Sequence, residues 1–261
     1  MTPTHAILEV AALSKAFGGV QAVRDVSFAL PAGQMIALIG PNGAGKTTCF
    51  NLINGQLAPD AGAVRLRGER IDGWPPRRIA HRGVGRTFQV AQTFASMTVR
   101  ENIETAIAAH ADRDGSWFER HHATLDADVD RLLGRIGIAS LAHAHCATLP
   151  YGELKRVEIA LALANAPSLL LMDEPTAGTA HDTRGALMQL AANLAHQDGL
   201  AVLFTEHDMD VVFGFADRVI VLDRGRIIAE GAPDEIRRNS KVQAVYLGVD
   251  QGEPGKSDRG S

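Results

Sequence analysis

Cysteine is scarce in this sequence, which has only Cys49 and Cys146 among its 261 residues. Two thiols cannot form the disulfide framework typical of small secreted domains, so the sequence favours a reducing compartment. A chain of this length buries roughly 70–75% of its unfolded surface and needs no such cross-links for stability. We therefore expect one large domain, or one domain with an inserted subdomain.

Long hydrophobic runs and net positive charge are also missing. The most apolar stretch, Ile159 to Met172, is shorter than the ~20 residues that a bilayer requires and is broken by Pro167. The N-terminus has no early positive charge, which argues against a signal peptide. The net charge of −4 argues against a general nucleic-acid binder. These absences predict a chain that is soluble by itself and reaches a membrane only through a partner.

Short apolar runs separated by turn signals mark the first 72 residues as β-rich. We expect strands at Ile7–Val10, Val26–Leu30 and Met35–Ile39. The last run is continuous, as in a strand buried on both faces. A helix should follow from Lys46 to about Leu57.

Residues 90–149 show helical periodicity and no strand pattern, so we expect an inserted helical subdomain there. Thr98-Val-Arg-Glu101 fits a capping box that opens a helix to about Ala111. From Tyr151 onward helical and strand patterns alternate, which predicts a mostly parallel α/β sheet. Residues 251–261 contain no apolar side chain, and we expect a disordered tail at 249–261.

A glycine-rich segment between the continuous apolar run and the next helix matches the phosphate-binding loop pattern. Glycines let the backbone wrap closely, so that successive N–H groups and the helix N-terminus face the phosphate oxygens. Lys46 would supply a charge for the β- and γ-phosphates, and the Thr47 hydroxyl would hold Mg²⁺. The predicted nucleotide-binding residues are Gly40, Pro41, Asn42, Gly43, Ala44, Gly45, Lys46, Thr47 and Thr48.

Two acids end the apolar run Leu169–Met172. Beside a phosphate loop, Asp173 at the carboxyl end of a parallel strand is placed to hold Mg²⁺ through water. Glu174 would then face the γ-phosphate and orient or deprotonate the attacking water. By itself the pattern describes many strand ends, and it gains weight from the phosphate loop upstream.

A third motif, Leu149-Pro-Tyr-Gly-Glu153, opens the helix that precedes the two acids. With it, the sequence resembles the ATP-binding cassette transporter ATPases, because the other motifs of that family also occur in this sequence and in the same order. Gln89 resembles the Q-loop glutamine, Pro175–His181 occupies the D-loop region, and His207 resembles the switch histidine. Phe17 lies where the family stacks an aromatic ring on adenine.

The resemblance implies a P-loop NTPase (RecA-like) α/β core, formed by residues 1–89 and 150–248, with an N-terminal antiparallel β portion and an inserted α-helical subdomain at 90–149. It implies ATP hydrolysis with Mg²⁺ as cofactor. The catalytic residues implied are Glu174, His207 and Gln89. The further site residues implied are Phe17 and Gly152 at the nucleotide, and Thr47, Gln89 and Asp173 at the Mg²⁺ ion, the last through water.

Three segments narrow the resemblance, namely Ala80–Gln89, Glu206–Val212 and Ala244–Gly248. They resemble the larger ATP-binding subunit of branched-chain amino-acid uptake systems. That resemblance implies an importer on the cytoplasmic face of the plasma membrane, with a second and different ATP-binding subunit as partner. Permease subunits and an external solute-binding protein would complete it, and no nucleic acid would be bound. The solute itself would not touch this chain.

The sequence departs from the family pattern at the signature motif and the D-loop. The usual serine is replaced by Pro150, which has no hydroxyl to offer a γ-phosphate, and Ala180 stands at the usual acidic or amide position. Both elements serve the facing subunit's nucleotide in the family's head-to-tail dimer. We therefore expect an asymmetric pair. The ATP site to which this chain contributes Leu149–Glu153 should hydrolyse ATP more slowly than the other site.

Some features keep two interpretations. A homodimeric ATPase of an export or lipid-extraction system would have similar loops, although Pro150 argues against it. Phe88, Phe94 and Met97 could contact a permease helix or belong to the core of the helical subdomain. The histidines around Cys146 fit no standard zinc spacing and suit a solvated surface better.

Overall fold

The structure is a computed structural model that describes residues 6–87, 93–111 and 122–247. The tail expected at 249–261 and the glutamine Gln89 therefore lie outside the described residues. Among the described helices, none combines the length and the apolar character needed to cross a membrane.

An antiparallel sheet of order β2-β1-β4-β5 forms the N-terminal part. Its strands are β1 (Ala6–Phe17), β2 (Val20–Pro31), β4 (Ala61–Leu66) and β5 (Glu69–Arg70). The first two are far longer than the apolar runs that predicted them. Their pairing continues through polar positions to the hairpin at Gly18–Gly19 because one face of the ribbon is exposed to solvent.

The central sheet has the order β10-β9-β3-β8-β7-β6 and is parallel except at β10. The mostly parallel sheet expected from the alternating pattern is therefore confirmed. Its strands are β3 (Met35–Ile39), β6 (Val84–Thr87), β7 (Leu169–Asp173), β8 (Ala201–Thr205), β9 (Arg218–Asp223) and β10 (Arg226–Gly231). Every residue of β3 is buried, as its continuous apolar run predicted.

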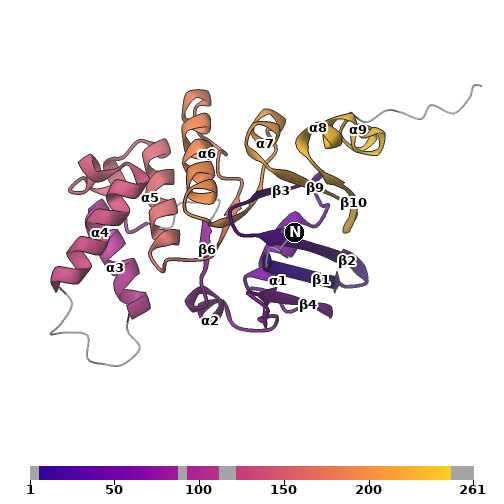
Figure 1. Ribbon diagram of the computed structural model, residues 1–261, viewed down its shortest axis with the longest axis horizontal. Helices are drawn as coiled ribbons and strands as arrows, with labels where there is room; N and C mark the ends of the chain where they lie inside the picture. Colours follow the sequence, from indigo (N-terminus) through magenta and orange to yellow (C-terminus); the bar gives the residue numbers. More distant parts are fainter. Residues whose placement is uncertain (1–5, 88–92, 112–121, 248–261) are drawn as a thin grey trace, which may run out of the picture.

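Two hydrophobic clusters cover the two faces of this sheet. One face packs on α1 (Lys46–Ile53) and on the antiparallel sheet, and Figure 1 shows these elements together at the lower right. The other face packs on α5 (Tyr151–Leu163), α6 (His181–His196), α7 (Met209–Phe215), α8 (Pro233–Arg238) and α9 (Ser240–Leu247). The phosphate-loop helix thus lies between two sheets.

Helix α1 is shorter than expected, ending at Ile53 instead of about Leu57. Asn54 caps it, and Gly55 follows with a φ of +78°. A Cβ atom at Gly55 would lie 2.3 Å from the carbonyl oxygen of Trp74, so only glycine permits this close approach. The chain then turns toward β4 and, later, the short helix α2 (Pro76–His81).

A helical unit lies at one end of the molecule, drawn at the left of Figure 1. It contains α3 (Val99–Ala111) and α4 (His122–Ile136), which contact each other and α5. The capping box is confirmed, since Thr98 N–H donates to Glu101 Oε2 at 2.7 Å and Glu101 N–H donates to Thr98 Oγ1 at 3.2 Å. In the described part of 93–149 the extended pairing is limited to one isolated bridge, between Thr98 and His145.

Candidate functional site

The candidate site lies where three neighbouring parallel strands end. Strand β3 runs into the glycine-rich loop, β7 ends at Asp173, and β8 ends at Thr205, which pairs in register with Asp173. Carboxyl ends of parallel strands meet at one edge of a sheet, where ligands of open α/β folds bind. The sheet topology therefore places the predicted phosphate loop and the predicted acids at the same edge.

Two glycines of the glycine-rich loop lie close to backbone carbonyl groups of neighbouring strands. A Cβ atom at Gly40 would lie 2.2 Å from Leu222 O, and one at Gly45 would lie 2.3 Å from Ala22 O. Both glycines have positive φ angles, 156° and 106°. Ala44 O also accepts a hydrogen bond of 3.0 Å from the N–H of Gly225, in the turn between β9 and β10. Neighbouring strands thus hold the loop in one conformation.

The Lys46 side chain folds back onto this loop. Its Nζ donates to Gly40 O at 2.7 Å and to Pro41 O at 3.1 Å, and the residue is only 8% exposed. Burial lowers the pKa of Lys46, while the carboxylates of Glu174 and Asp173 oppose this effect. The ammonium group is therefore held between the loop and the two acids.

A cavity of about 200 Å³ opens over the loop. Glu174 and His207 line it together with residues of the loop. The residues that line it are Ala22, Asn42, Gly43, Ala44, Gly45, Lys46, Thr47, Thr48, Glu174 and His207. The structure thus brings together most of the residues predicted for phosphate binding and two of the three predicted for catalysis.

Glu174 has a strained backbone. Its φ is +48°, a left-handed conformation that costs a non-glycine residue about 1–3 kcal/mol and tends to occur at functional sites. Its N–H donates to Thr205 at the end of β8, at 3.1 Å to the Oγ1 atom and 3.2 Å to the carbonyl oxygen. In this conformation Glu174 Oε1 lies 2.5 Å from His207 Nε2.

The carboxylate of Asp173 has a different partner at each oxygen. Thr205 Oγ1 donates to Asp173 Oδ1 at 2.8 Å, and Arg86 Nη2 lies 3.4 Å from Asp173 Oδ2. Burial lowers the pKa of Arg86, and the negative charge of Asp173 opposes this. Sequence analysis missed both partners. It singled out His207 without Thr205, and it included Arg86 only as a member of the segment Ala80–Gln89.

Mg²⁺ fits the oxygen ligands at this edge. The ion takes near-octahedral oxygen ligands and is held in proteins by one or two carboxylates together with phosphate oxygens and water. Thr47, a cavity-lining residue, offers a hydroxyl, and Asp173 offers a carboxylate at the end of β7, on the same edge of the sheet. No cluster of three or more His, Cys, Asp or Glu side chains that could hold a metal ion occurs in the described ranges.

The D-loop region is hydrogen-bonded to the segment that follows β8 and contains the switch histidine. Glu206, which is buried, accepts from Thr176 Oγ1 at 2.6 Å and from Thr176 N–H at 2.8 Å. Arg184 on α6 donates to Asp208 Oδ2 at 2.9 Å. These contacts connect the D-loop region and α6 to Glu206 and Asp208, the neighbours of His207 in the chain.

The signature motif lies beside the D-loop and away from the cavity over the phosphate loop. A Cβ atom at Gly152 would lie 2.4 Å from Thr183 Cγ2, and one at Gly178 would lie 3.2 Å from the ring of Tyr151. The structure therefore does not bring Gly152 to this chain's own phosphate loop. Pro150 is the N-cap of α5, with φ of −56°, and the helix itself begins at Tyr151. Its carbonyl accepts the first helical N–H groups there.

The remaining predicted residues are placed as follows. Phe17 is the last residue of β1, and 46% of its surface is exposed. It does not line the cavity over the phosphate loop, although Ala22, on the next strand of the same hairpin, does. Gln89 lies outside the described residues. Phe94 is 57% exposed, so the core interpretation of this residue is wrong, and Met97 is half-buried.

Comparisons with known proteins give a consistent result. A family model described as ABC transporter matches residues 23–177, and one described as branched-chain amino acid ATP-binding cassette transporter matches residues 226–251. Among relatives, the high-affinity branched-chain amino acid transport ATP-binding protein BraF of Pseudomonas aeruginosa is 37% identical, over 93% of this chain and 98% of its own length. LivG of Escherichia coli, with the same description, is 37% identical with the same coverage of both chains.

A solved structure with a similar fold is the ADP conformation of an ATP-binding cassette of an ABC transporter. It has a TM-score of 0.82 and 29% sequence identity, with 93% of this chain and 99% of that chain covered. The P-loop NTPase fold expected from the sequence is therefore confirmed over nearly the whole length.

Proposed function

Since this chain belongs to the ATP-binding cassette transporter family and is an ATP-hydrolysing subunit of such a transporter, we propose that the transporter imports branched-chain amino acids or similar small polar solutes. The main support for this proposal is the sequence similarity to BraF and LivG along almost the full length of both chains. The match of the C-terminal segment, 226–251, to a family model specific for that transporter type supports it.

At the site, we propose that the backbone of Gly40–Thr48 binds the ATP phosphates. The ammonium group of Lys46 would exchange its contacts to Gly40 O and Pro41 O for phosphate oxygens. Thr47 and Asp173 would hold Mg²⁺, whose charge offsets the negative charge that develops on the transferring phosphoryl group. Phe17 stays a predicted adenine contact, and Gln89 a predicted partner of both ion and water.

Glu174 and His207 act together in this proposal. Glu174 would accept the proton of the attacking water, or orient that water, and His207 would hold the carboxylate in place and face the γ-phosphate. The strained backbone of Glu174 is compatible with this role because it directs the carboxylate away from β7 and toward the cavity.

We propose that a second, different ATP-binding subunit completes each site and that a permease docks near the exposed Phe94. The chain's own Gly152 lies apart from its own phosphate loop, as it must if it serves the nucleotide of a facing subunit. The facing subunit's ATP site, to which this chain contributes Pro150 and Ala180, is then the slower of the two. In the assembled pair, Pro150→Ser combined with Ala180→Asp should accelerate it, and unchanged turnover would contradict the asymmetry.

The test measures ATP turnover of the purified chain alone, with its candidate partner ATPase, and in liposomes with permease and binding protein. Weak turnover alone, a rise with the partner, and a further rise with leucine but not with glutamate would support the proposal. Glu174→Gln should abolish all three. Full activity of the chain alone would indicate a homodimeric ATPase, and stimulation by glutamate instead of leucine would contradict the substrate.

A further inference from the structure

Arg86 occupies the edge strand β6, next to the strand that ends in Asp173. Its Nη1 donates to Asn51 Oδ1 on α1 at 2.9 Å and to Gln56 Oε1 just beyond that helix at 3.1 Å. Its Nη2 lies 3.4 Å from Asp173 Oδ2. One guanidinium group therefore connects the end of the phosphate-loop helix to the carboxylate proposed as a metal ligand.

This contact lies in a weakly screened environment. The side chains of Arg86 and Asp173 are only 10% and 16% exposed, so water and salt reduce the interaction of their charges far less than at the surface. A cation that approaches Asp173 meets the positive charge of Arg86 beside the same carboxylate. The two cations therefore compete for one group.

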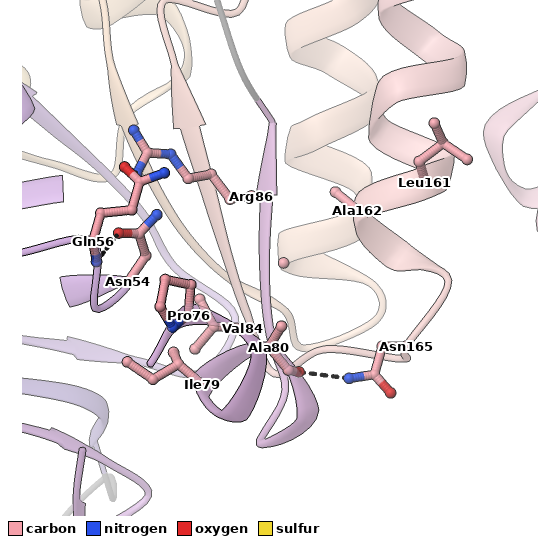
Figure 2. Close-up of a pocket in the computed structure, with 11 residues that line it drawn as sticks. Asn54, Gln56, Pro76, Ile79, Ala80, Val84, Arg86, Leu161, Ala162 and Asn165 are labelled. Carbon is pink, nitrogen blue, oxygen red and sulfur yellow. Dashed lines mark hydrogen bonds between the residues drawn. The ribbon is translucent and has the colours of Figure 1, made fainter. Parts of the chain in front are cut away.

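The guanidinium has an alternative place. Its contact with Asp173 Oδ2 is longer than its hydrogen bonds to Asn51 and Gln56, so the contact to Oδ2 can be lost while those two hydrogen bonds remain. Arg86 and Gln56 also line a separate cavity of about 210 Å³ between α1, α2, β6 and α5, shown in Figure 2. Asp173 is not among the residues that line this cavity, so Arg86 borders open space that is separate from its contact with the carboxylate.

We propose that Arg86 is a positioning residue that holds the Asp173 carboxylate before the metal arrives and competes with Mg²⁺ for it, which sets the metal affinity of the site. The inference rests on the proposed function, because that proposal makes Asp173 a metal residue. Thr205 keeps its hydrogen bond to Oδ1 throughout, so the competition concerns Oδ2 alone.

The test is the Mn²⁺ affinity of the full chain in saturating ADP, measured from the EPR signal of free Mn²⁺. Arg86→Gln removes the competing charge and should bind Mn²⁺ about three- to tenfold more tightly than the wild type. Arg86→Lys keeps a charge in place and should change the affinity by less than about twofold. Loss of a merely structural residue would weaken binding, so unchanged or weaker Mn²⁺ binding by folded Arg86→Gln would overturn the inference.

Asp173→Asn separates this inference from the proposed function. If Asp173→Asn leaves Mn²⁺ affinity unchanged, the metal role proposed for Asp173 fails and the inference about Arg86 falls with it. If it weakens Mn²⁺ binding, the gain from Arg86→Gln should disappear in the Asp173→Asn background, because the two charges act on each other. A gain that persists there overturns the inference alone.

A second variant applies if Arg86→Gln does not fold. Gln56 is exposed, and Gln56→Glu places a carboxylate beside Arg86 Nη1 without changing the core. Drawing the guanidinium away from Asp173 should tighten Mn²⁺ binding about two- to threefold, and again only when Asp173 is present. No gain in that variant would overturn the inference.

Discussion

His207 Nε2 lies 2.5 Å from Glu174 Oε1, although 33 residues separate them in the chain. Strands β7 and β8 are adjacent and parallel, with Asp173 paired to Thr205, so the residues that follow the two strands meet above the same edge. Glu174 reaches His207 because its backbone adopts a left-handed turn at the strand end. The contact therefore depends on the sheet register and on one strained residue.

The short contact predicts that Glu174 and His207 act as a unit. Glu174→Gln and His207→Ala should each lower ATP turnover about 10²–10⁴-fold, and the double variant should lose little more than the worse single variant. The measurement is phosphate release by the assembled transporter, with ADP affinity as control, because neither change removes a phosphate-loop residue. Multiplicative losses would show that the two side chains act independently.

The features that the sequence predicted correctly depend on local chemistry. The strand Met35–Ile39, the glycine-rich loop that follows it and the capping box Thr98–Glu101 are each specified by neighbouring residues. The end of α1 carried a local signal too, since Asn54-Gly55 is a typical helix stop, and the expected helix to Leu57 passed over it.

The parts that the sequence could not predict depend on distant pairing. Arg86 and Asp173 are 87 residues apart and meet only because β6 pairs in parallel with β7. Strand β6 contains Gly85 and Arg86 and has no apolar run, so periodicity does not reveal it. The role of Thr205 as the shared partner of Asp173 and Glu174 likewise requires the β7–β8 register.

The two thiols should be unreactive in the folded chain. Burial raises the pKa of Cys49 to about 12 and also raises the pKa of Cys146, and both side chains are nearly inaccessible. The thiolate is the nucleophile, so raised pKa values and burial both slow its reactions. With Ellman's reagent at pH 8 we expect no release in native buffer and two equivalents per chain in 6 M guanidinium, a condition chosen to unfold most domains. Rapid release of one equivalent in native buffer would contradict the packing around that thiol.

Two glycines of the antiparallel sheet should differ in their tolerance of alanine. Gly62 and Gly68 both have positive φ angles, 91° and 80°. A Cβ atom at Gly62 would lie 2.4 Å from Ala12 O, whereas one at Gly68 would meet nothing within 4 Å. Gly68→Ala should therefore cost about 1–2 kcal/mol from backbone strain alone, and Gly62→Ala about 3 kcal/mol or more.

Urea unfolding of the two glycine variants measures this difference. Neither glycine lines the phosphate-loop cavity, so the ADP affinity of the folded fraction should stay at the wild-type value for both. Equal losses of unfolding free energy would show that the strands around Ala12 relax to accept the methyl group.

Replacing Ala180 by a residue that caps helix α6 should stabilise the chain. It is the N-cap of α6, with extended backbone angles and no side-chain hydrogen bond to the first turn. Ala180→Asp supplies an acceptor for those N–H groups and should raise the free energy of unfolding by about 1 kcal/mol. Ala180→Asn supplies the same acceptor without charge, so a similar gain would assign the effect to hydrogen bonding instead of the helix dipole.

The same substitution separates stability from catalysis, because Ala180 also stands in the D-loop that faces the partner's nucleotide in the proposed pair. A stabilised chain with unchanged turnover in the complex would confirm the cap and leave Pro150 as the proposed cause of the slower site. A rise in turnover that Ala180→Asp and Ala180→Asn share would follow from a better ordered D-loop. A rise confined to Ala180→Asp would place the new carboxylate in contact with the facing site, where Pro150 then remains as the other cause of slow hydrolysis.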